Sequence, residues 1–206
     1  MNISTKLEIR GGLRLMRPLV IAVLASMLVS DSHGADIFLK LVGAADGAAV
    51  KGEGRDEQYP GSEGWFALNS FSLGIENTVT LGSASGGAGA GKAAFMDLEL
   101  EKPLDSASPT MFQALASGKR FDSAQLVVRR GGGTEVPEAY LVYEFKVVYL
   151  SSQKWSGSDG DDVPGESVRM IYGALKITYK PSDPKTGKPG SPIEGKWNGI
   201  ENNDSF

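Results

Sequence analysis

The stretch Leu141-Val142-Tyr143-Glu144-Phe145-Lys146-Val147-Val148-Tyr149 decides the fold of this chain. Side chains two residues apart point to the same face of a β-strand. The stretch therefore predicts a long strand that is apolar on one face and partly charged on the other. We expect the core face to carry Leu141, Tyr143, Phe145, Val147 and Tyr149, with Glu144 and Lys146 opposite.

The same period of two recurs along the chain from residue 36 onward. Apolar side chains alternate with polar ones in five further segments: Ile37, Leu39 and Leu41; Phe71, Leu73 and Ile75; Met96, Leu98 and Leu100; Leu126 and Val128; Ile171, Leu175 and Ile177. Half-buried antiparallel strands produce this pattern. We therefore expect an all-β fold, either a small β-barrel or a two-sheet antiparallel sandwich.

One short α-helix interrupts the strands and is expected to flank them. Ser108 suits the N-cap, Pro109 the first helical position and Gly118 the position just after the last turn. Helical spacing places Met111, Phe112 and Leu115 on one apolar face.

Composition excludes several classes of site. The 206 residues contain no cysteine, and the single histidine, His33, lies in the N-terminal segment. Without these residues the rest of the chain cannot form a Ser-His-Asp triad, a disulfide framework or a His-ligated metal site. A formal net charge of -4 argues against binding to nucleic acid. We expect no catalytic residues, no metal and no cofactor.

Residues 1–34 have the pattern of a secretory signal peptide. Lys6, Arg10, Arg14 and Arg17 precede an apolar run that continues from Leu19 to Val29, followed by small and polar residues up to Gly34. The run is shorter than the ~20 residues that cross a bilayer, so stable membrane insertion is not expected. We interpret 1–34 as a signal-peptide-like segment and 35–206 as one β-barrel domain. A start codon placed too far upstream is the alternative.

Three motifs have weaker functional interpretations. Gly86 to Lys92 approaches a phosphate-binding loop, but Ala93 stands where Ser or Thr is needed, and a strand follows instead of a helix. Asp159, Asp161 and Asp162 lack the spacing of a calcium loop and fit a solvated turn. The carboxylates on the strand at Asp97, Glu99 and Glu101 have no identifiable catalytic partner.

A series of segments, in order, resembles the Hcp family, the tube proteins of the bacterial type VI secretion system. The resemblance is most specific at Leu104-Asp105-Ser106-Ala107-Ser108-Pro109, followed by Ala116-Ser117-Gly118-Lys119-Arg120-Phe121. It also includes Asp36-Ile37-Phe38-Leu39-Lys40, Phe71-Ser72-Leu73-Gly74-Ile75-Glu76, the Gly86–Lys92 loop, Val127-Val128-Arg129-Arg130-Gly131-Gly132, Val148-Tyr149-Leu150-Ser151-Ser152 and Ile177-Thr178-Tyr179-Lys180-Pro181. These segments extend over about four-fifths of the chain.

The resemblance implies a non-enzymatic protein with an Hcp-like barrel. Copies would form a homo-hexameric ring, and rings would stack into a tube that a sheath expels behind a spike protein. Small effector proteins would travel in the lumen of the ring. On this basis Ser70, Ser72 and Glu76 are expected to face the lumen, with Ser72 at the cargo-facing position. The arm that reaches another subunit would contain Gly82, Gly86, Gly87, Gly89, Gly91 and Lys92.

The N-terminal segment departs from the family pattern, because family members normally lack a signal peptide. The resemblance predicts assembly in the cytoplasm and release through the type VI apparatus. A working signal in 1–34 would instead send the chain to the periplasm. An exported ring, or an exported binding module outside a firing tube, is therefore the alternative function.

Overall fold

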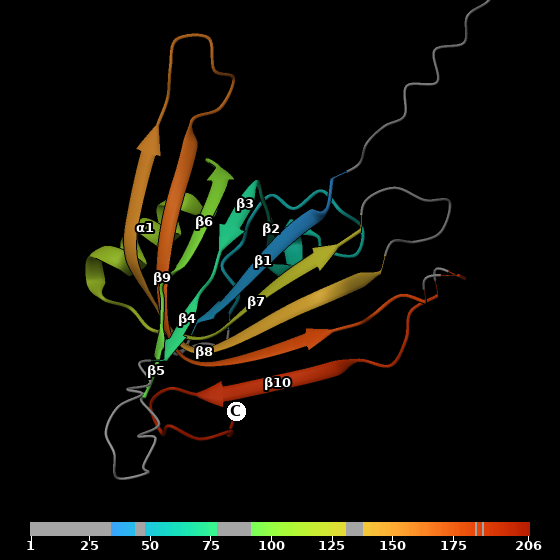
Figure 1. Cartoon of the computed structure of the whole chain (residues 1–206). Coiled ribbons are helices and arrows are strands. Elements are labelled where there is room, and N and C mark those ends of the chain that lie inside the picture. The colour runs from blue at the N-terminus through green and yellow to red at the C-terminus, as the bar shows by residue number, and fades with distance from the viewer. Residues whose placement is uncertain (1–33, 44–47, 78–91, 131–137, 184, 187) are drawn as a thin grey trace, which may run out of the picture. The chain divides into compact units, whose positions relative to one another are not determined.

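Two long antiparallel strands organise the fold, as the opening stretch of sequence predicts. They are β8 (Ala139–Ser156) and β9 (Gly165–Tyr179), which form a hairpin paired along most of its length. The computed structural model describes residues 34–43, 48–77, 92–130, 138–183, 185–186 and 188–206. Figure 1 shows the two strands passing through the centre of the domain.

The main sheet is antiparallel throughout and has the strand order β2-β1-β7-β8-β9-β6-β3, with β10 also paired to β9. Strands β4 and β5 form a separate two-stranded sheet. The remaining strands are β1 (Asp36–Gly43), β2 (Trp65–Leu68), β3 (Ser70–Ser72), β4 (Ile75–Asn77), β5 (Ala93–Phe95), β6 (Leu98–Pro103), β7 (Phe121–Arg129) and β10 (Ile193–Asn198). These strands confirm the expected all-β barrel-like fold.

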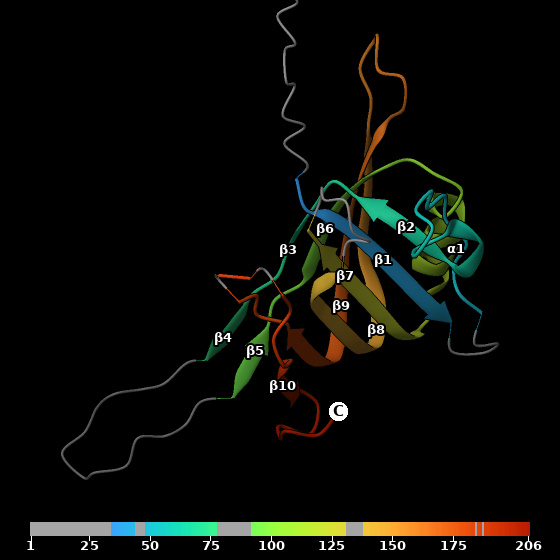
Figure 2. The same ribbon diagram turned by 90° about the vertical axis from the view of Figure 1, so that its right-hand side faces the viewer.

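The main sheet curls so that one face encloses the core (Figure 2). Leu39, Leu126, Phe145, Leu100 and Met170 come from five different strands and are buried in one apolar cluster. Burial of a large apolar side chain contributes about 1.5–3 kcal/mol. The alternating segments at β1, β6 and β7 therefore supply the core as their sequence predicts.

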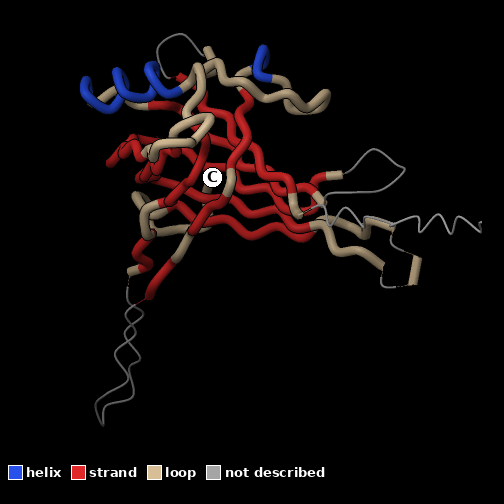
Figure 3. The backbone as a smooth tube through the Cα atoms, turned by 90° about the horizontal axis from the view of Figure 1, so that it is seen from above, coloured by secondary structure: helices blue, strands red, loops and turns tan. Residues whose placement is uncertain are grey.

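Helix α1 (Ser108–Ser117) lies at one end of the strands (Figure 3). It ends as predicted, because Gly118 is left-handed at φ 63° and its N–H donates to the carbonyls of Ala114 and Leu115. The start and face differ from expectation. Ser108 is the first helical residue, not the N-cap, and Phe112 is half exposed while Met111 and Ala114 are buried.

The alternation in β8 breaks at Val147, where the sequence interpretation was wrong. Val147 has a φ of 56°, and the pairs Lys146–Ala174 and Val148–Tyr172 flank it without a Val147–Gly173 pair. The irregularity shifts the alternation by one residue. Val148 and Leu150 therefore face the core, in place of Val147 and Tyr149. Beyond this point the same shift exposes Ile171 and buries Met170 and Tyr172.

The alternation also fails near β4 and β5, which form their own small sheet. Ile75 and Met96 are both about half exposed, although each was expected to join an apolar strand face. Gly74 lies against Met96, where an added Cβ would come within 2.6 Å of the Met96 sulfur. The chain leaves the main sheet here, so the period of two no longer indicates the core.

A smaller apolar cluster lies on the outer face of β1 and β7. Phe38 stacks on Tyr59 with ring centroids 4.7 Å apart, and Tyr59 meets Trp65 edge to face. The guanidinium of Arg129 is 5.2 Å from the Phe38 ring and donates hydrogen bonds to Asp36 and Asp56. Arg129 thus holds the 51–64 segment against the sheet.

Candidate functional site

A polar face covers the outside of the sheet formed by β3, β6, the first half of β9 and the second half of β8. Paired residues on neighbouring antiparallel strands point to the same side. Register aligns Ser72, Glu99, Arg169 and Ser152 in one row, and Ser70, Glu101, Ser167 and Lys154 in the next. We call these eight residues the wall face.

The wall face is hydrated and mixed in charge. Glu99 Oε1 and Arg169 Nη2 are 2.9 Å apart, with both side chains about half exposed. Exposed pairs of this kind contribute ~0–1 kcal/mol to stability, so they shape the surface more than they hold the fold. Asp97 accepts a hydrogen bond of 2.9 Å from the Ser151 hydroxyl at the edge of the face. The apolar side chain of Ile171 is exposed close to this edge.

The sequence predicts part of this surface. Ser70 and Ser72 are exposed on β3 within the wall face. Glu76 is exposed too, but it lies on β4 and pairs with Ala94, so the structure places it in the small sheet. Lys92 is exposed immediately before β5. The five expected arm glycines, Gly82, Gly86, Gly87, Gly89 and Gly91, lie outside the described residues.

None of the charged members of the wall face was predicted as a site residue. Alternation does place Glu99 and Glu101 on one strand face, yet it gives no information about which strands lie beside them. Arg169, Ser167 and Lys154 join them only through the register of β9 and β8. The surface therefore depends on pairing between strands that are distant in the sequence, and the local alternation of residues does not predict this pairing.

A buried ionic network supports the wall face from its inner side. The Lys102 ammonium is 2.8 Å from Glu166 Oε2 and 2.8 Å from Asp105 Oδ1, and the Lys102 and Glu166 side chains are fully buried. Glu166 also accepts hydrogen bonds from Ser108 at 2.5 Å and from the Trp155 indole at 2.9 Å. The network joins β6, β9 and β8 to the first turn of α1.

Two opposing effects act on the pKa of Glu166. Burial raises it, whereas hydrogen bonds from Lys102, Ser108 and Gln153 lower it, and the net pKa lies below the ordinary value for glutamate. The carboxylate is therefore ionised at neutral pH and paired with Lys102. Such a pair is typical of structural support, because both charges are withdrawn from solvent and from any ligand.

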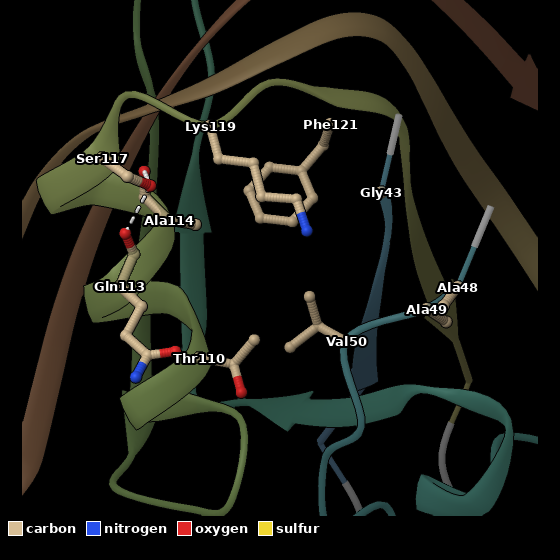
Figure 4. A pocket seen from close by; sticks show the side chains of 10 residues that line it. All are labelled: Gly43, Ala48, Ala49, Val50, Thr110, Gln113, Ala114, Ser117, Lys119 and Phe121. Carbon is tan, nitrogen blue, oxygen red and sulfur yellow. Dashed lines mark hydrogen bonds between the residues drawn. The ribbon is translucent and has the colours of Figure 1, made fainter. Parts of the chain in front are cut away.

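Helix α1 borders a recess of about 270 Å³, shown in Figure 4. Its lining comes from the 48–50 segment and from the exposed flank of the helix, and Lys119 is the one ionisable side chain among the lining residues. This recess therefore brings no acid and base together. Within the described residues no group of three or more His, Cys, Asp or Glu side chains is arranged to hold a metal ion. Asp159, Asp161 and Asp162 thus form no such group.

No helix in the described part of the chain is both long and apolar enough to cross a membrane.

Comparisons with known proteins agree with the fold. A family model described as "Type VI secretion system effector, Hcp" matches residues 38–179. The protein hcp1 of Pseudomonas aeruginosa is 32% identical over 111 residues, which cover 54% of this chain and 68% of that protein.

Solved structures extend the similarity over most of the chain. A type six secretion system protein is 29% identical with a TM-score of 0.71, covering 82% of this chain and 99% of its own. Hcp1 from Salmonella typhimurium is 27% identical with a TM-score of 0.64, covering 84% and 100%. The family match spans well over half of the sequence, and each of the two solved structures covers more than four-fifths of this chain. The chain therefore belongs to the Hcp family of the type VI secretion system.

Proposed function

We propose that this chain is a structural subunit of the type VI secretion tube and a carrier of effector proteins. Copies form hexameric rings, the rings stack into the expelled tube, and the wall face lines the lumen. The observation that carries the proposal is the wall face itself. It is a continuous polar surface on a barrel that keeps its apolar core inside.

The chemistry of the wall face suits a passage for proteins. Hydroxyl groups and half-exposed charges bind water and offer few apolar contacts to a folded cargo. Cargo would be held by weak polar contacts that are repeated around the ring and would be released after expulsion. Ser70 and Ser72 lie on the edge strand β3 within the wall face. We extend the proposed lumen surface to Glu99, Glu101 and Arg169.

Other surfaces would serve assembly. The arm between β4 and β5, which includes Gly82 to Lys92, would reach a neighbouring subunit or ring. The spike protein and the sheath would be further partners, and the role requires neither catalysis nor a cofactor. Assembly in the cytoplasm and release through the apparatus would follow.

The pattern of residues 1–34 favours a second candidate, an exported Hcp-like ring or binding module that acts in the periplasm or outside the cell. N-terminal sequencing of the native protein separates the two candidates. A mature start at or near Ala35 in the periplasmic fraction would support export. A cytoplasmic protein that either keeps residues 1–34 or is translated without them would support the role in the tube.

Native mass spectrometry of residues 35–206, followed by a cargo assay, tests the main proposal. We expect a mass of six copies and higher steady-state levels of a small effector when the two proteins are co-expressed. Arg169→Glu should reduce this protection without changing the ring mass, since it reverses charge on the wall face alone. Lys51→Glu, at an exposed lysine outside that face, is the matched control, because it changes the net charge by the same amount and sign. A strict monomer at high concentration would contradict the proposal.

A further inference from the structure

A recess on the outer face of β1, β7 and β8 has no role in the wall face. Register places Lys40, Gln125 and Glu144 in one row and Ser123 beside Lys146 in the next. The recess has a volume of about 330 Å³ and is bordered by Phe206 from the chain's last residues. We call this surface the lysine recess, defined by Lys40, Ser123, Gln125, Glu144, Lys146 and Phe206.

The lysine recess contains two ammonium groups, those of Lys40 and Lys146, that have no ion-pair partner among the described residues. Lys40 Nζ lies 5.5 Å from the centre of the Trp65 ring, and Lys146 Nζ lies 4.4 Å from that of Phe206. Within the described residues neither ammonium forms an ion pair, and the carboxylate of Glu144 is already paired with Lys176. Aromatic contacts shield each lysine on one side and leave N–H donors for an anion.

The opposite charge is displayed at the far end of β8. The last pair of the β8–β9 hairpin is Ser156–Gly165, and Asp159, Asp161 and Asp162 lie in the connection beyond it. All three are exposed. Asp161 accepts a 2.8 Å hydrogen bond from the Ser158 N–H and so shapes the turn. Asp159 and Asp162 form no ion pair within the part of the chain that the structure describes.

One copy of the chain cannot bring these two surfaces together. The hairpin extends away from the other strands in Figure 1. About ten strand residues separate Lys146 from the end of β8, which corresponds to roughly 30 Å along an extended strand. The acidic connection thus points away from the lysine recess of the same subunit. It can therefore contact the lysine recess of a second copy of the chain.

We propose that the acidic β8–β9 connection of one copy docks in the lysine recess of the next. Asp159 and Asp162 would pair with Lys40 and Lys146. The two surfaces are different, so the contact is heterologous, and such contacts close into a ring when the rotation between copies permits. This inference rests on the proposed ring and names the surfaces that form it.

Charge reversal with rescue tests the pairing, read by native mass spectrometry. We expect Lys40→Glu with Lys146→Glu to reduce the ring fraction by at least about tenfold, because like charges would face each other across the contact. Asp159→Lys with Asp162→Lys should have the same effect. All four substitutions in one chain should restore the ring. Lys51→Glu with Lys119→Glu, two exposed lysines outside the recess, is the control and should leave the ring intact.

The outcomes separate this inference from the proposed function. If the unmodified chain forms no ring, the proposed function as a ring subunit is wrong, and the docking that rests on it is wrong as well. If the unmodified chain forms a ring and neither charge reversal reduces the ring fraction, the proposed docking is wrong, whereas the proposed function as a ring subunit is still supported. Loss of the ring in both reversals without rescue would also overturn the pairing, and unfolding midpoints in urea would show whether the variants still fold.

Cysteine cross-linking gives an independent measurement, because the chain has no cysteine of its own. We expect Ser123→Cys with Asp162→Cys in one chain to give disulfide-linked multimers under mild oxidation. A chain with only one of the two substitutions should give no series of disulfide-linked multimers. Absence of cross-links in the double variant, under conditions where its ring is intact, would contradict the proposed contact.

Discussion

Glu166 and Lys102 form the ionic centre of the network beneath the wall face. Both side chains are fully buried and 2.8 Å apart, and the Lys102 ammonium also donates to Asp105, Ser108 and the Pro103 carbonyl. Glu166→Gln would leave a buried ammonium with only part of its compensation. We expect this change to lower the free energy of unfolding by about 3–5 kcal/mol. Urea denaturation at neutral pH measures it.

The exposed pair Glu99–Arg169 is the matched control for the buried pair. Both pairs join β6 to β9, but the exposed one is hydrated and screened by salt. Glu99→Gln should therefore change the free energy of unfolding by less than about 1 kcal/mol. Equal losses in the two variants would show that burial does not strengthen the Lys102–Glu166 pair.

Acid should weaken the fold through the same carboxylate. Hydrogen bonds from Lys102, Ser108 and Gln153 outweigh the effect of burial and hold the pKa of Glu166 below its ordinary value. A carboxyl with a lowered folded-state pKa stabilises the fold above its unfolded pKa, and this contribution is lost as pH falls through the folded pKa. We expect stability to fall from about pH 4.5 downward, and to fall less steeply in Glu166→Gln. A parallel decline in both proteins would exclude Glu166 as a cause.

Asp56 adds to the same acid response from the other side of the sheet. Burial raises its pKa, but hydrogen bonds from Arg129, Gln58 and Tyr59 lower it to a net value below the ordinary one. The sequence indicates neither this contact nor the Lys102–Glu166 pair, because the partners in each are more than sixty residues apart. At the residue scale, periodicity predicts burial of apolar side chains and gives no information on charged partners.

At the scale of the elements, the end of α1 is the feature that sequence predicts best. Gly118 has a φ of 63°, and an added Cβ would meet no atom within 4 Å. A side chain at this position would therefore reduce the stability only through the strain of a left-handed backbone. We expect Gly118→Ala to destabilise the protein by about 1 kcal/mol and Gly118→Asn by less, because asparagine tolerates the left-handed region. Thermal unfolding of the unmodified protein, Gly118→Ala and Gly118→Asn measures the order of their stabilities. An unchanged midpoint in Gly118→Ala would contradict the prediction.

The strands show where local prediction stops. Alternation correctly places Leu39, Leu98 and Leu126 in the core. It fails at Val147, because β8 and β9 run through both halves of the curled sheet and accommodate the change of direction with an irregular pair. A β-branched residue at positive φ is unfavourable in isolation. Only the packing of the whole barrel makes the position acceptable, so no local signal marks it.

At the scale of the whole molecule, the candidate site depends on strand order. Period two identifies each polar strand face separately, including those of β3 and β6. The wall face arises because β3, β6, β9 and β8 are neighbours in the sheet, although β3 and β9 are far apart in the chain. The family resemblance supplies the expected role of Ser72, whereas the register adds Glu99 and Arg169 beside it.

The start of the domain provides a final prediction. Strand β1 begins at Asp36, whose carboxylate accepts hydrogen bonds of 2.7 and 3.2 Å from Arg129. A chain that begins at Ala35 keeps this contact, so we expect its free energy of unfolding to match that of the full chain within about 0.5 kcal/mol. A chain that begins at Ile37 should lose about 1 kcal/mol, because the Asp36 carboxylate is partly exposed and Arg129 keeps its pair with Asp56.

Asp36→Asn in the chain that begins at Ala35 is the control for this pair of truncations. It keeps the strand length and removes only the charge, so it should account for most of the loss in the shorter chain. Urea unfolding of all four proteins gives the comparison. If the chain from Ala35 were much less stable than the full chain, residues 1–34 would contribute to the folded domain. A leader that is cleaved without consequence for the barrel would then be excluded, because its removal would cost the domain part of its stability.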